Sequence, residues 1–398
     1  MHQTPQSNRT HIGIFGKRNA GKSSLLNAIS EQNIALVSEI GGTTTDPVKK
    51  AMELIPYGPV LFIDTAGLDD KGTLGSLRTK RSKEMFAHID FAIVLHSSKD
   101  IDLEFEKELL KDLKTFNVPF IKVINKTDLV DNKTLLNFKN DFSSYQLIST
   151  LNRNSILDFK KELIKELSKK EEEETLLGDM LPYNSDVVLV VPIDSEAPKG
   201  RLILPQVQLI RDCLDHGIKC HVVRDTELED AINYLPKIDL VVTDSQAFKE
   251  VSKIVPNNIN LTSFSILLAR QKGDLGVFKD GINALDSLKE DAHILIAETC
   301  THNTSHEDIG RYKIPALLKR HFGNKLDFTF FQGKEYPSDL ANYDLVIHCG
   351  GCMLTRKQML NRMTLVENKQ IPITNYGMFL AWGANILERS LLPFKEEL

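Results

Sequence analysis

Apolar and polar positions along the first part of the chain alternate in a way that predicts strands separated by helices. Short apolar runs of the kind that form buried strands lie at 11–15, 60–63, 91–95, 120–124 and 145–148. Longer stretches with helical spacing lie between or after them, at 22–30, 102–117 and 155–168. Strands joined by helices imply crossover connections, so we expect a largely parallel sheet covered on both faces.

The same alternation restarts after a charged run at 169–174, which we interpret as a solvated helix end and linker. Further strand-like runs lie at 186–191, 218–223, 239–243, 293–297, 326–331 and 344–347. Helical stretches lie at 206–215, 227–234, 246–254 and 309–321. The pattern predicts an α/β protein with mainly parallel sheets, divided into domains 1–172, 186–270 and 271–398 with a linker at 173–185.

Composition narrows the classes of protein that this chain can represent. Of its 398 residues, 41% are apolar and 26% are charged, which is ordinary for a soluble globular protein. A formal net charge of −5 argues against a surface that coats nucleic acid. No apolar run approaches the roughly 20 residues of a membrane helix, and the polar start lacks the apolar core of a signal peptide. We expect a cytoplasmic protein without membrane or nucleic-acid partners.

The first strand is followed by a phosphate-binding loop, Gly-Lys-Arg-Asn-Ala-Gly-Lys-Ser, that opens a helix. Its glycines allow tight curvature, so that successive backbone N–H groups can point at phosphate oxygens. Lys22 neutralises the β- and γ-phosphates, and the Ser23 hydroxyl can ligate Mg²⁺. The residues we assign to the phosphates are Gly16, Asn19, Ala20, Gly21, Lys22, Ser23 and Ser24.

Two further motifs fit the γ-phosphate and the metal. Asp64-Thr65-Ala66-Gly67 follows another strand, so Asp64 can hold a Mg²⁺-bound water while the Gly67 amide approaches the γ-phosphate. Between this motif and the phosphate loop lies Gly-Gly-Thr-Thr-Thr-Asp at 41–46, where Thr44 is placed to sense γ-phosphate and Mg²⁺. The predicted magnesium ligands are therefore Ser23, Thr44 and Asp64.

A fourth motif selects the base. Asn125-Lys126-Thr127-Asp128 follows a strand, and the Asp128 carboxylate can accept two hydrogen bonds from guanine N1 and N2, donors that adenine does not present. Ser149 and Thr150, after the next strand, would back the base. The motifs in this order predict a site for GTP and GDP with Mg²⁺.

Over about residues 10–170 this order resembles the TrmE–Era class of GTPases, and it implies a P-loop GTPase domain. Members activated by K⁺ use an asparagine at the position of Asn19 to ligate that ion, so the resemblance makes Asn19 a potassium ligand; the alternative is a plain turn residue. Leu68 stands where Ras-like enzymes carry a water-orienting glutamine, which predicts slow intrinsic hydrolysis.

Three of the five cysteines lie in two short loops of the last quarter, Cys300-x-His302 and His348-Cys349-x-x-Cys352. Each loop directly follows a predicted strand, so the two can converge at the carboxyl ends of a parallel sheet. Three thiolates and one imidazole would make a closed zinc site. Three thiolates can instead hold three irons of a 4Fe–4S cluster and leave the fourth iron to an exchangeable ligand. A third interpretation, core thiols, applies better to Cys213 and Cys220.

The whole combination, over about residues 10–395, resembles the FeFe-hydrogenase maturation GTPases, the HydF family. The resemblance implies potassium-stimulated GTP hydrolysis, a homodimer formed through the middle domain, and an oxygen-sensitive 4Fe–4S cluster in the last domain; whether dimers form a tetramer stays open. Cys300, Cys349 and Cys352 match the cluster cysteines. His302 is the candidate fourth ligand, and His348 is expected beside the ligands rather than on the metal.

The same resemblance implies that the protein is a scaffold and carrier for the transient di-iron subcluster. Its partners would be radical-SAM maturases and the FeFe-hydrogenase apoprotein. An alternative is a TrmE- or Era-class GTPase that acts on RNA or ribosomes and holds a structural zinc, but a basic RNA-binding domain would then be expected. A catalytic iron–sulfur enzyme would need an acid–base set beside the loops, and the sequence has no obvious one.

Overall fold

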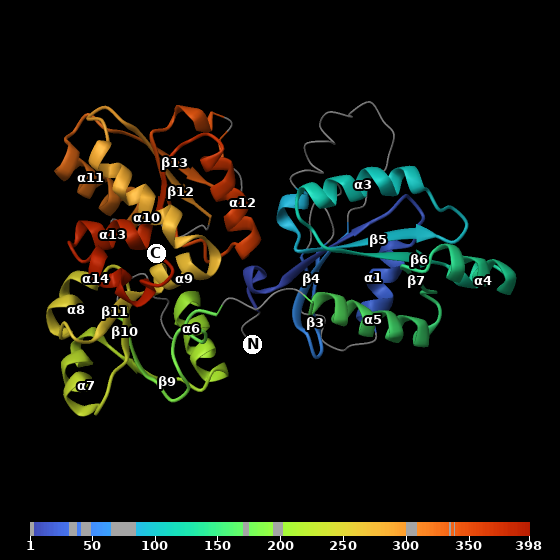
Figure 1. Cartoon of the computed structure of the whole chain (residues 1–398), viewed down its shortest axis with the longest axis horizontal. Helices are drawn as coiled ribbons and strands as arrows, with labels where there is room; N and C mark the ends of the chain where they lie inside the picture. The colour runs from blue at the N-terminus through green and yellow to red at the C-terminus, as the bar shows by residue number, and fades with distance from the viewer. Residues whose placement is uncertain are drawn as a thin grey trace. The chain divides into compact units, whose positions relative to one another are not determined.

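The computed structural model describes most of the chain in two compact units, Met1–Glu172 and Glu173–Leu398 (Figure 1). The described residues are 4–31, 38–40, 49–64, 85–169, 175–193, 202–299, 309–333, 336–337 and 339–398. Of the predicted site residues, Thr44, Gly67, Cys300 and His302 lie outside the described ranges, as do Thr65, Ala66 and Leu68 beside them. No helix among the described residues is both long and apolar enough to cross a membrane.

The first unit contains a seven-stranded sheet in the order β2-β3-β4-β1-β5-β6-β7. Its strands are β1 (Thr10–Phe15), β2 (Ser38–Ile40), β3 (Lys49–Leu54), β4 (Gly58–Asp64), β5 (Phe91–Ser97), β6 (Phe120–Asn125) and β7 (Tyr145–Leu147). From β4 to β7 the pairs are parallel, which confirms the expected α/β fold, whereas β2 and β3 pair antiparallel with their neighbours. The strand β3 is not predicted by the apolar pattern, because Lys49 and Lys50 at its start interrupt the apolar run.

Helices cover both faces of this sheet (Figure 1). They are α1 (Lys22–Glu31), α3 (Leu103–Thr115), α4 (Asn132–Asp141) and α5 (Arg153–Leu167). On one face Leu25 of α1 and Phe159 of α5 share a buried cluster with Ile12, and on the other Leu113 of α3 packs with Val94. The sheet is therefore buried on both sides, as its nearly continuous apolar strands require.

The second unit contains two four-stranded sheets in which every pair is parallel. The first has the order β11-β10-β8-β9 and the second β13-β12-β14-β15. Their strands are β8 (Asp186–Val190), β9 (Lys219–Val223), β10 (Leu240–Thr243), β11 (Asn260–Ser263), β12 (His293–Glu298), β13 (Asp327–Gln332), β14 (Leu345–His348) and β15 (Ile373–Asn375). The two smaller α/β parts that the sequence predicts are thus present.

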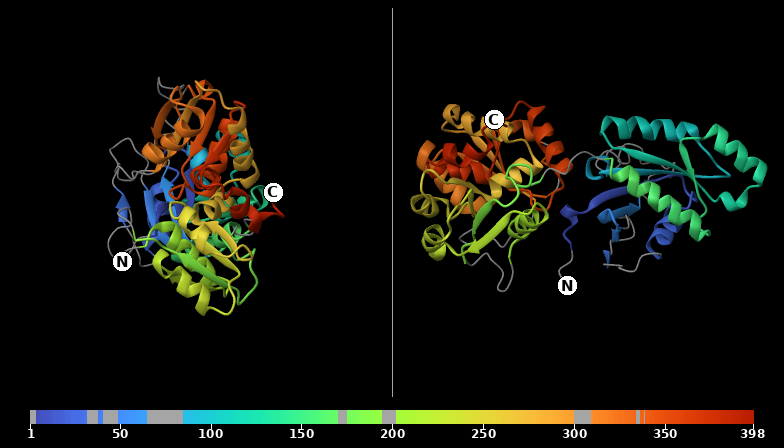
Figure 2. Two further views of the ribbon diagram at one scale, coloured as in Figure 1. Left: turned by 90° about the vertical axis from the view of Figure 1, so that its left-hand side faces the viewer. Right: turned by 60° about the horizontal axis from the view of Figure 1, so that its bottom comes forward.

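The two sheets of the second unit share one hydrophobic core, and Figure 2 shows the two parts lying against each other within this unit. Their helices are α6 (Leu204–Asp215), α7 (Leu228–Tyr234), α8 (Phe248–Ile254), α9 (Phe264–Lys272), α10 (Leu275–Asn283), α11 (Ile314–Phe322), α12 (Arg356–Glu367), α13 (Tyr376–Gly383) and α14 (Leu387–Leu391). The helix α9 packs against α6 of the first part and against α12 and α13 of the second. It therefore joins the two parts.

Two local features differ from the sequence expectations. Within the predicted linker 173–185, Leu176 and Leu177 are buried in the core, and the Asp212 carboxylate accepts hydrogen bonds from their backbone N–H groups at 3.2 and 2.8 Å. This segment therefore packs as part of the second unit. The helix expected at 309–321 begins as a π-helical turn, Ile309–Lys313, before α11 starts at the turn that contains Pro315.

Candidate functional site

The predicted phosphate loop lies between β1 and α1, at the carboxyl edge of the first sheet. The Lys22 side chain is buried, and its ammonium donates hydrogen bonds to the carbonyl oxygens of Gly16 and of Lys17, the latter at 3.2 Å. Gly21 has a φ of 98°, and a Cβ there would come within 2.3 Å of the Asn125 side-chain nitrogen. Glycine is therefore required at this position both by the backbone and by the space available.

Two of the predicted magnesium ligands, Ser23 of α1 and Asp64 at the end of β4, are in contact. The Ser23 hydroxyl donates to Asp64 Oδ2 at 2.8 Å. Asp64, at the end of β4, is only 3% exposed, and its Oδ1 is buried with no hydrogen-bond partner among the residues that the structure describes. A buried carboxylate oxygen is costly unless a cation or water engages it, so this pair of oxygens fits a hard cation such as Mg²⁺.

The predicted base-recognition loop is hydrogen-bonded to the phosphate loop. Asn125, fully buried at the end of β6, donates through Nδ2 to the Ala20 carbonyl at 3.1 Å. Lys126, with a left-handed φ of 63°, donates through Nζ to the Asn19 carbonyl at 2.6 Å. The hydrogen-bonded residues are 105 and 107 positions apart in sequence, and the parallel order β1-β5-β6 brings the two motifs to one edge of the sheet.

The remaining predicted base contacts lie beside this loop. The Ser149 hydroxyl donates a hydrogen bond to Asp128 Oδ1, and Asp128 itself is exposed. Thr150 follows Ser149 and is half-buried. The Asp128 carboxylate is therefore oriented by Ser149 while remaining accessible to a ligand.

A pocket of about 270 Å³ lies beside the phosphate loop and includes residues that the sequence analysis did not single out. It is lined by residues 17–20, 95–97, 99–100, 126 and 129. At its rim Lys17 forms ion pairs with Asp102 and, at 3.9 Å, with Asp100. The hydrogen bond from Lys17, reinforced by the Phe105 N–H, lowers the pKa of Asp102 to about 2. The signal for Asp102 in the sequence was its position as an acidic N-cap before a helix.

The two cysteine loops leave neighbouring strands of the last sheet. β12 pairs in parallel with β14, with Ala297 opposite His348. The Cys349 N–H donates to the Ala297 carbonyl at 2.9 Å, and the Thr299 hydroxyl lies 3.4 Å from the Cys349 sulfur. β12 and β14 are parallel strands, as expected, and the Cys349 loop follows the carboxyl end of β14. Whether the loop of Cys300 converges with it lies outside the described residues.

The His348 side chain is fully buried, and both of its ring nitrogens make hydrogen bonds. Arg362 Nε lies 2.9 Å from Nε2, and because an arginine only donates, Nε2 accepts and the proton sits on Nδ1. Nδ1 then donates to the Cys349 carbonyl at 2.6 Å. In this arrangement His348 orients the cysteine loop and has no nitrogen free for a metal.

The described part of the cysteine site contains two thiols. Cys349 is buried and Cys352 is half-buried. Gly351 between them has a φ of 61°, and a Cβ there would come within 2.3 Å of the Met359 side chain; at Gly350 a Cβ would meet no described atom within 4 Å. Thiolates on one tight loop suit zinc or an iron–sulfur cluster. Within the described ranges, no three His, Cys, Asp or Glu side chains form a metal-binding group.

The other two cysteines lie in the first part of the second unit. Cys213 of α6 is fully buried, and Cys220 of β9 packs partly buried against the same core, in agreement with the prediction of core thiols. A hydrogen bond between the two thiols raises the pKa of Cys213 and lowers that of Cys220.

Sequence comparisons identify relatives of the first domain. The description "50S ribosome-binding GTPase" matches residues 11–126. The tRNA modification GTPase MnmE of Pelagibacter ubique is 38% identical over 130 residues, which cover 32% of this chain and 28% of that protein. The GTPase Der of Mycoplasmopsis agalactiae is 39% identical over 127 residues, which cover 31% and 29%. The chain thus spans less than a third of the length of these curated relatives.

A solved structure of Aquifex aeolicus Era bound to GDP and AlF4− has a TM-score of 0.32 and 18% identity, and the match covers 54% of this chain and 92% of that one.

The second unit matches two further family descriptions: "Hydrogen maturase F dimerization domain" over residues 176–273 and "Hydrogen maturase F tetramerization domain" over residues 276–393. These two matches together cover more than half of the chain and follow a GTPase domain, so the chain belongs to the hydrogen maturase F family.

Proposed function

We propose that the first unit binds GTP with Mg²⁺ and hydrolyses it to GDP and phosphate. The observation that carries this proposal is the pair of hydrogen bonds from Asn125 to Ala20 and from Lys126 to Asn19, which join base and phosphate loops into one site. The proposed phosphate contacts are Gly16, Asn19, Ala20, Gly21, Lys22, Ser23, Ser24 and Gly67. The proposed base contacts are Asn125, Lys126, Asp128, Ser149 and Thr150.

In this proposal Lys22 and the bound Mg²⁺ neutralise the negative charge of the phosphates. The Lys22 ammonium, now held by loop carbonyls, turns to the β- and γ-phosphates when they displace its partners. Ser23 and Asp64, with Thr44, hold Mg²⁺, which neutralises phosphate charge when bound. Asp64 Oδ1 supports this role, because it is buried and accepts no hydrogen bond from any residue that the structure describes. With Leu68 in place of a glutamine, intrinsic hydrolysis is slow.

Asn19 is the proposed potassium ligand. It lies at the rim of the pocket beside the phosphate loop, exposed and with a left-handed φ of 65°. That φ also suits a plain turn residue, because asparagine tolerates it better than most residues do. A comparison of hydrolysis in K⁺ and Na⁺ separates the two roles.

For the second unit we propose a 4Fe–4S site held by Cys300, Cys349 and Cys352. Support comes from the contact between Thr299 and the Cys349 sulfur, because the residue after Thr299 is Cys300 and its loop therefore starts beside Cys349. When bound with three thiolates, such a cluster leaves one iron whose ligand can exchange. His302 remains the candidate for that position, and His348 acts as a positioning residue through the Cys349 carbonyl.

The proposed cargo is the di-iron subcluster of the FeFe-hydrogenase active site. Membership of the hydrogen maturase F family supports a role as scaffold and carrier, working in the cytoplasm between radical-SAM maturases and the hydrogenase apoprotein. No described atom lies within 4 Å of a Cβ placed at Gly350, which supports approach of the di-iron subcluster to the cysteine loop. The chain's own contribution is a loop whose backbone is held by His348 and in which Cys349 is buried and Cys352 half-buried.

We further propose that two copies pair through β9. Its residues are largely half-buried or exposed, whereas β11 at the opposite edge is packed against α14. An unpaired strand edge presents N–H and C=O groups that a second copy can satisfy. Val222 of β9 and Val207 and Leu214 of α6 are exposed apolar residues on these two elements. The tetramerization domain would then join such dimers.

The proposed 4Fe–4S site is tested by metal and sulfide analysis of the anaerobically purified full-length chain. We expect about four iron and four sulfide per chain, lost in Cys349→Ser and Cys352→Ser. Cys213→Ser is the matched control, because it removes a buried thiol from the other part of the unit. Stoichiometric zinc without iron would contradict the scaffold and favour a GTPase with a structural zinc site.

A further inference from the structure

The last turn of α9 is hydrogen-bonded to the loop that carries Cys349 and Cys352. The Lys272 ammonium donates to the carbonyl oxygens of Gly351 at 3.3 Å, Cys352 at 3.2 Å and Leu354 at 2.9 Å. An ammonium has three donors, so its hydrogen-bonding capacity is filled by this loop. Lys272 thus holds three carbonyls within four residues in one arrangement.

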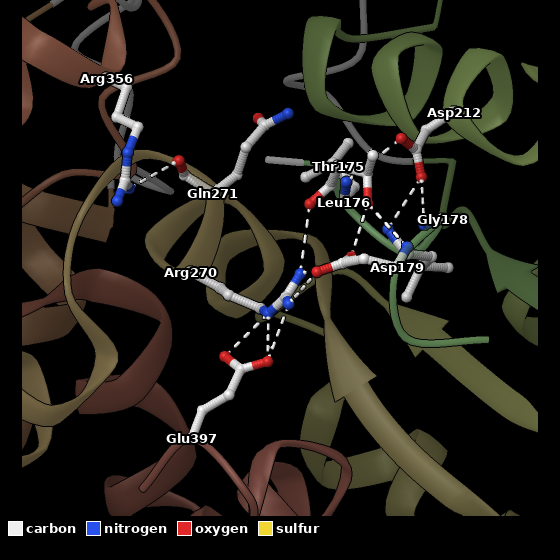
Figure 3. A network of polar contacts seen from close by, with 10 residues as sticks. Thr175, Leu176, Gly178, Asp179, Asp212, Arg270, Gln271, Arg356 and Glu397 are labelled. Atoms are coloured by element: carbon white, nitrogen blue, oxygen red, sulfur yellow. Dashed lines mark hydrogen bonds and ion pairs between the residues drawn. The ribbon is translucent and has the colours of Figure 1, made fainter. Parts of the chain in front are cut away.

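The contact is reciprocal, since a residue at the start of α12 reaches back to the same helix turn. Arg356 Nη1 donates to the carbonyl oxygens of Gln271 and Gly273, both at 3.0 Å, and Figure 3 shows its side chain directed at Gln271. The side chains of Lys272 and Arg356 therefore both link the cysteine loop to the end of α9. The residues that they join are 79 to 85 positions apart in sequence.

The end of α9 is itself fixed from its other side. Arg270 forms ion pairs with Asp179 and with Glu397, and donates to the Thr175 carbonyl at 3.2 Å (Figure 3). In the sequence, Thr175 and Asp179 lie near the start of the second unit and Glu397 lies near its end. The position of Lys272 is thus set by the framework of this unit rather than by the loop that it contacts.

The Lys272 side chain is also unusual because it carries a positive charge in a buried position. The residue is only 5% exposed, and its ammonium is held by the loop carbonyls of Gly351, Cys352 and Leu354. Lysine is rarely this buried without a compensating partner. The carbonyls of the loop and the end of a helix both favour a cation here, and thiolates favour it further.

We propose that Lys272 is a positioning residue of the cysteine site, which fixes the backbone of residues 351–354 and supplies a positive charge beside the loop of Cys349 and Cys352. The inference rests on the proposed 4Fe–4S site. A cluster becomes more negative when it is reduced, so a nearby cation in a poorly solvated site favours the reduced form. Removal of that cation shifts the reduction potential of the bound cluster to more negative values.

The test is an anaerobic redox titration of full-length protein, followed by EPR, for four variants. Lys272→Met keeps the apolar stem without the charge, Lys272→Gln keeps a neutral donor, and Lys272→Arg keeps the charge. Lys253→Met, at an exposed position of α8, removes the same net charge elsewhere. We expect more negative potentials for the Met and Gln variants, a near wild-type potential for Lys272→Arg, and no change for Lys253→Met.

Equal potentials in wild type, Lys272→Gln and Lys272→Met would overturn the proposal, as would equal shifts in the Gln and Arg variants. If the wild type holds zinc instead of iron, the 4Fe–4S proposal fails and the same variants are compared by zinc release to a chelator. Faster release from Lys272→Met than from Lys272→Arg then supports the positioning role. Equal release from both would overturn it.

Discussion

The side-chain amide of Asn125 donates a 3.1 Å hydrogen bond to the backbone carbonyl of Ala20, and this bond joins the end of β6 to the phosphate loop. Asn125 is fully buried, so no water competes for the contact. The loop that selects the base and the loop that holds the phosphates therefore share one framework, and a change at either one is transmitted to the other.

Loss of this bond should weaken nucleotide binding without unfolding the domain. We expect Asn125→Ala to bind GTP and GDP about five- to tenfold more weakly, since a net hydrogen bond contributes about 1 kcal/mol. Titration with a fluorescent GDP analogue measures the change. Asn154→Ala, exposed on α5, is the control, and equal affinities for the two variants would remove the proposed role of Asn125.

Base selectivity should change when Asp128 loses one acceptor. In Asp128→Asn an amide N–H faces a guanine N–H, so we expect weaker GTP binding and a preference for xanthosine triphosphate, whose extra carbonyl accepts from the new donor. Competition binding with the two nucleotides measures this. Asp131→Asn, which alters the nearby cap of α4, is the control. Unchanged GTP affinity in Asp128→Asn would contradict the assignment of this loop.

The role of Asn19 in cation binding can be separated from its role in the turn. Its φ of 65° is accessible to glycine, so Asn19→Gly removes the side chain without straining the backbone. We expect wild-type hydrolysis to be faster in K⁺ than in Na⁺, and Asn19→Gly to lose this difference while still binding GDP. A K⁺/Na⁺ rate ratio that the substitution leaves intact would mean that Asn19 is a turn residue.

Asp102 should make the stability of the first unit depend on pH. Its pKa falls from 3.8 to about 2 on folding, chiefly through the hydrogen bond from Lys17, so its stabilisation is complete above about pH 4 and is lost as the pH falls through 2. Asp102→Asn retains a cap but not the charge. We expect its urea midpoint to lie below the wild-type value at pH 7, with a gap that narrows between pH 4 and 2.

The exposed Asp141→Asn serves as the control for that series. A difference between wild type and Asp102→Asn that stays constant over the whole pH range would assign the effect to the geometry of the cap instead of the charge.

Self-association through β9 should be sensitive to a charge on that strand. Val222 is 46% exposed, and Val222→Lys places an ammonium at the proposed strand-to-strand contact, where desolvating it is unfavourable. We expect light scattering to report a smaller assembly for this variant of the full-length chain. Tyr234→Lys, at an 87% exposed position on α7, should keep the wild-type mass. An unchanged mass in both variants would place the contact elsewhere.

The sequence by itself determined the features that depend on contiguous residues. The phosphate loop at 16–23 and the motif at 125–128 were recognisable because each needs several residue types in a fixed local order. Most strands and helices followed from apolar periodicity, as in β8 and α6. Short or polar elements such as β3 and β15 carried too little of this signal to be predicted.

Only the tertiary structure decided which distant groups meet. Asn125 reaches Ala20, and Lys272 reaches Gly351, because strand order and helix packing bring these segments together, and local periodicity contains no information about either. The same holds for His348, whose second nitrogen is occupied by Arg362. Burial, too, is a property of the whole fold: Leu176 and Leu177 follow an acidic run that reads as a linker, yet they lie in the core of the second unit.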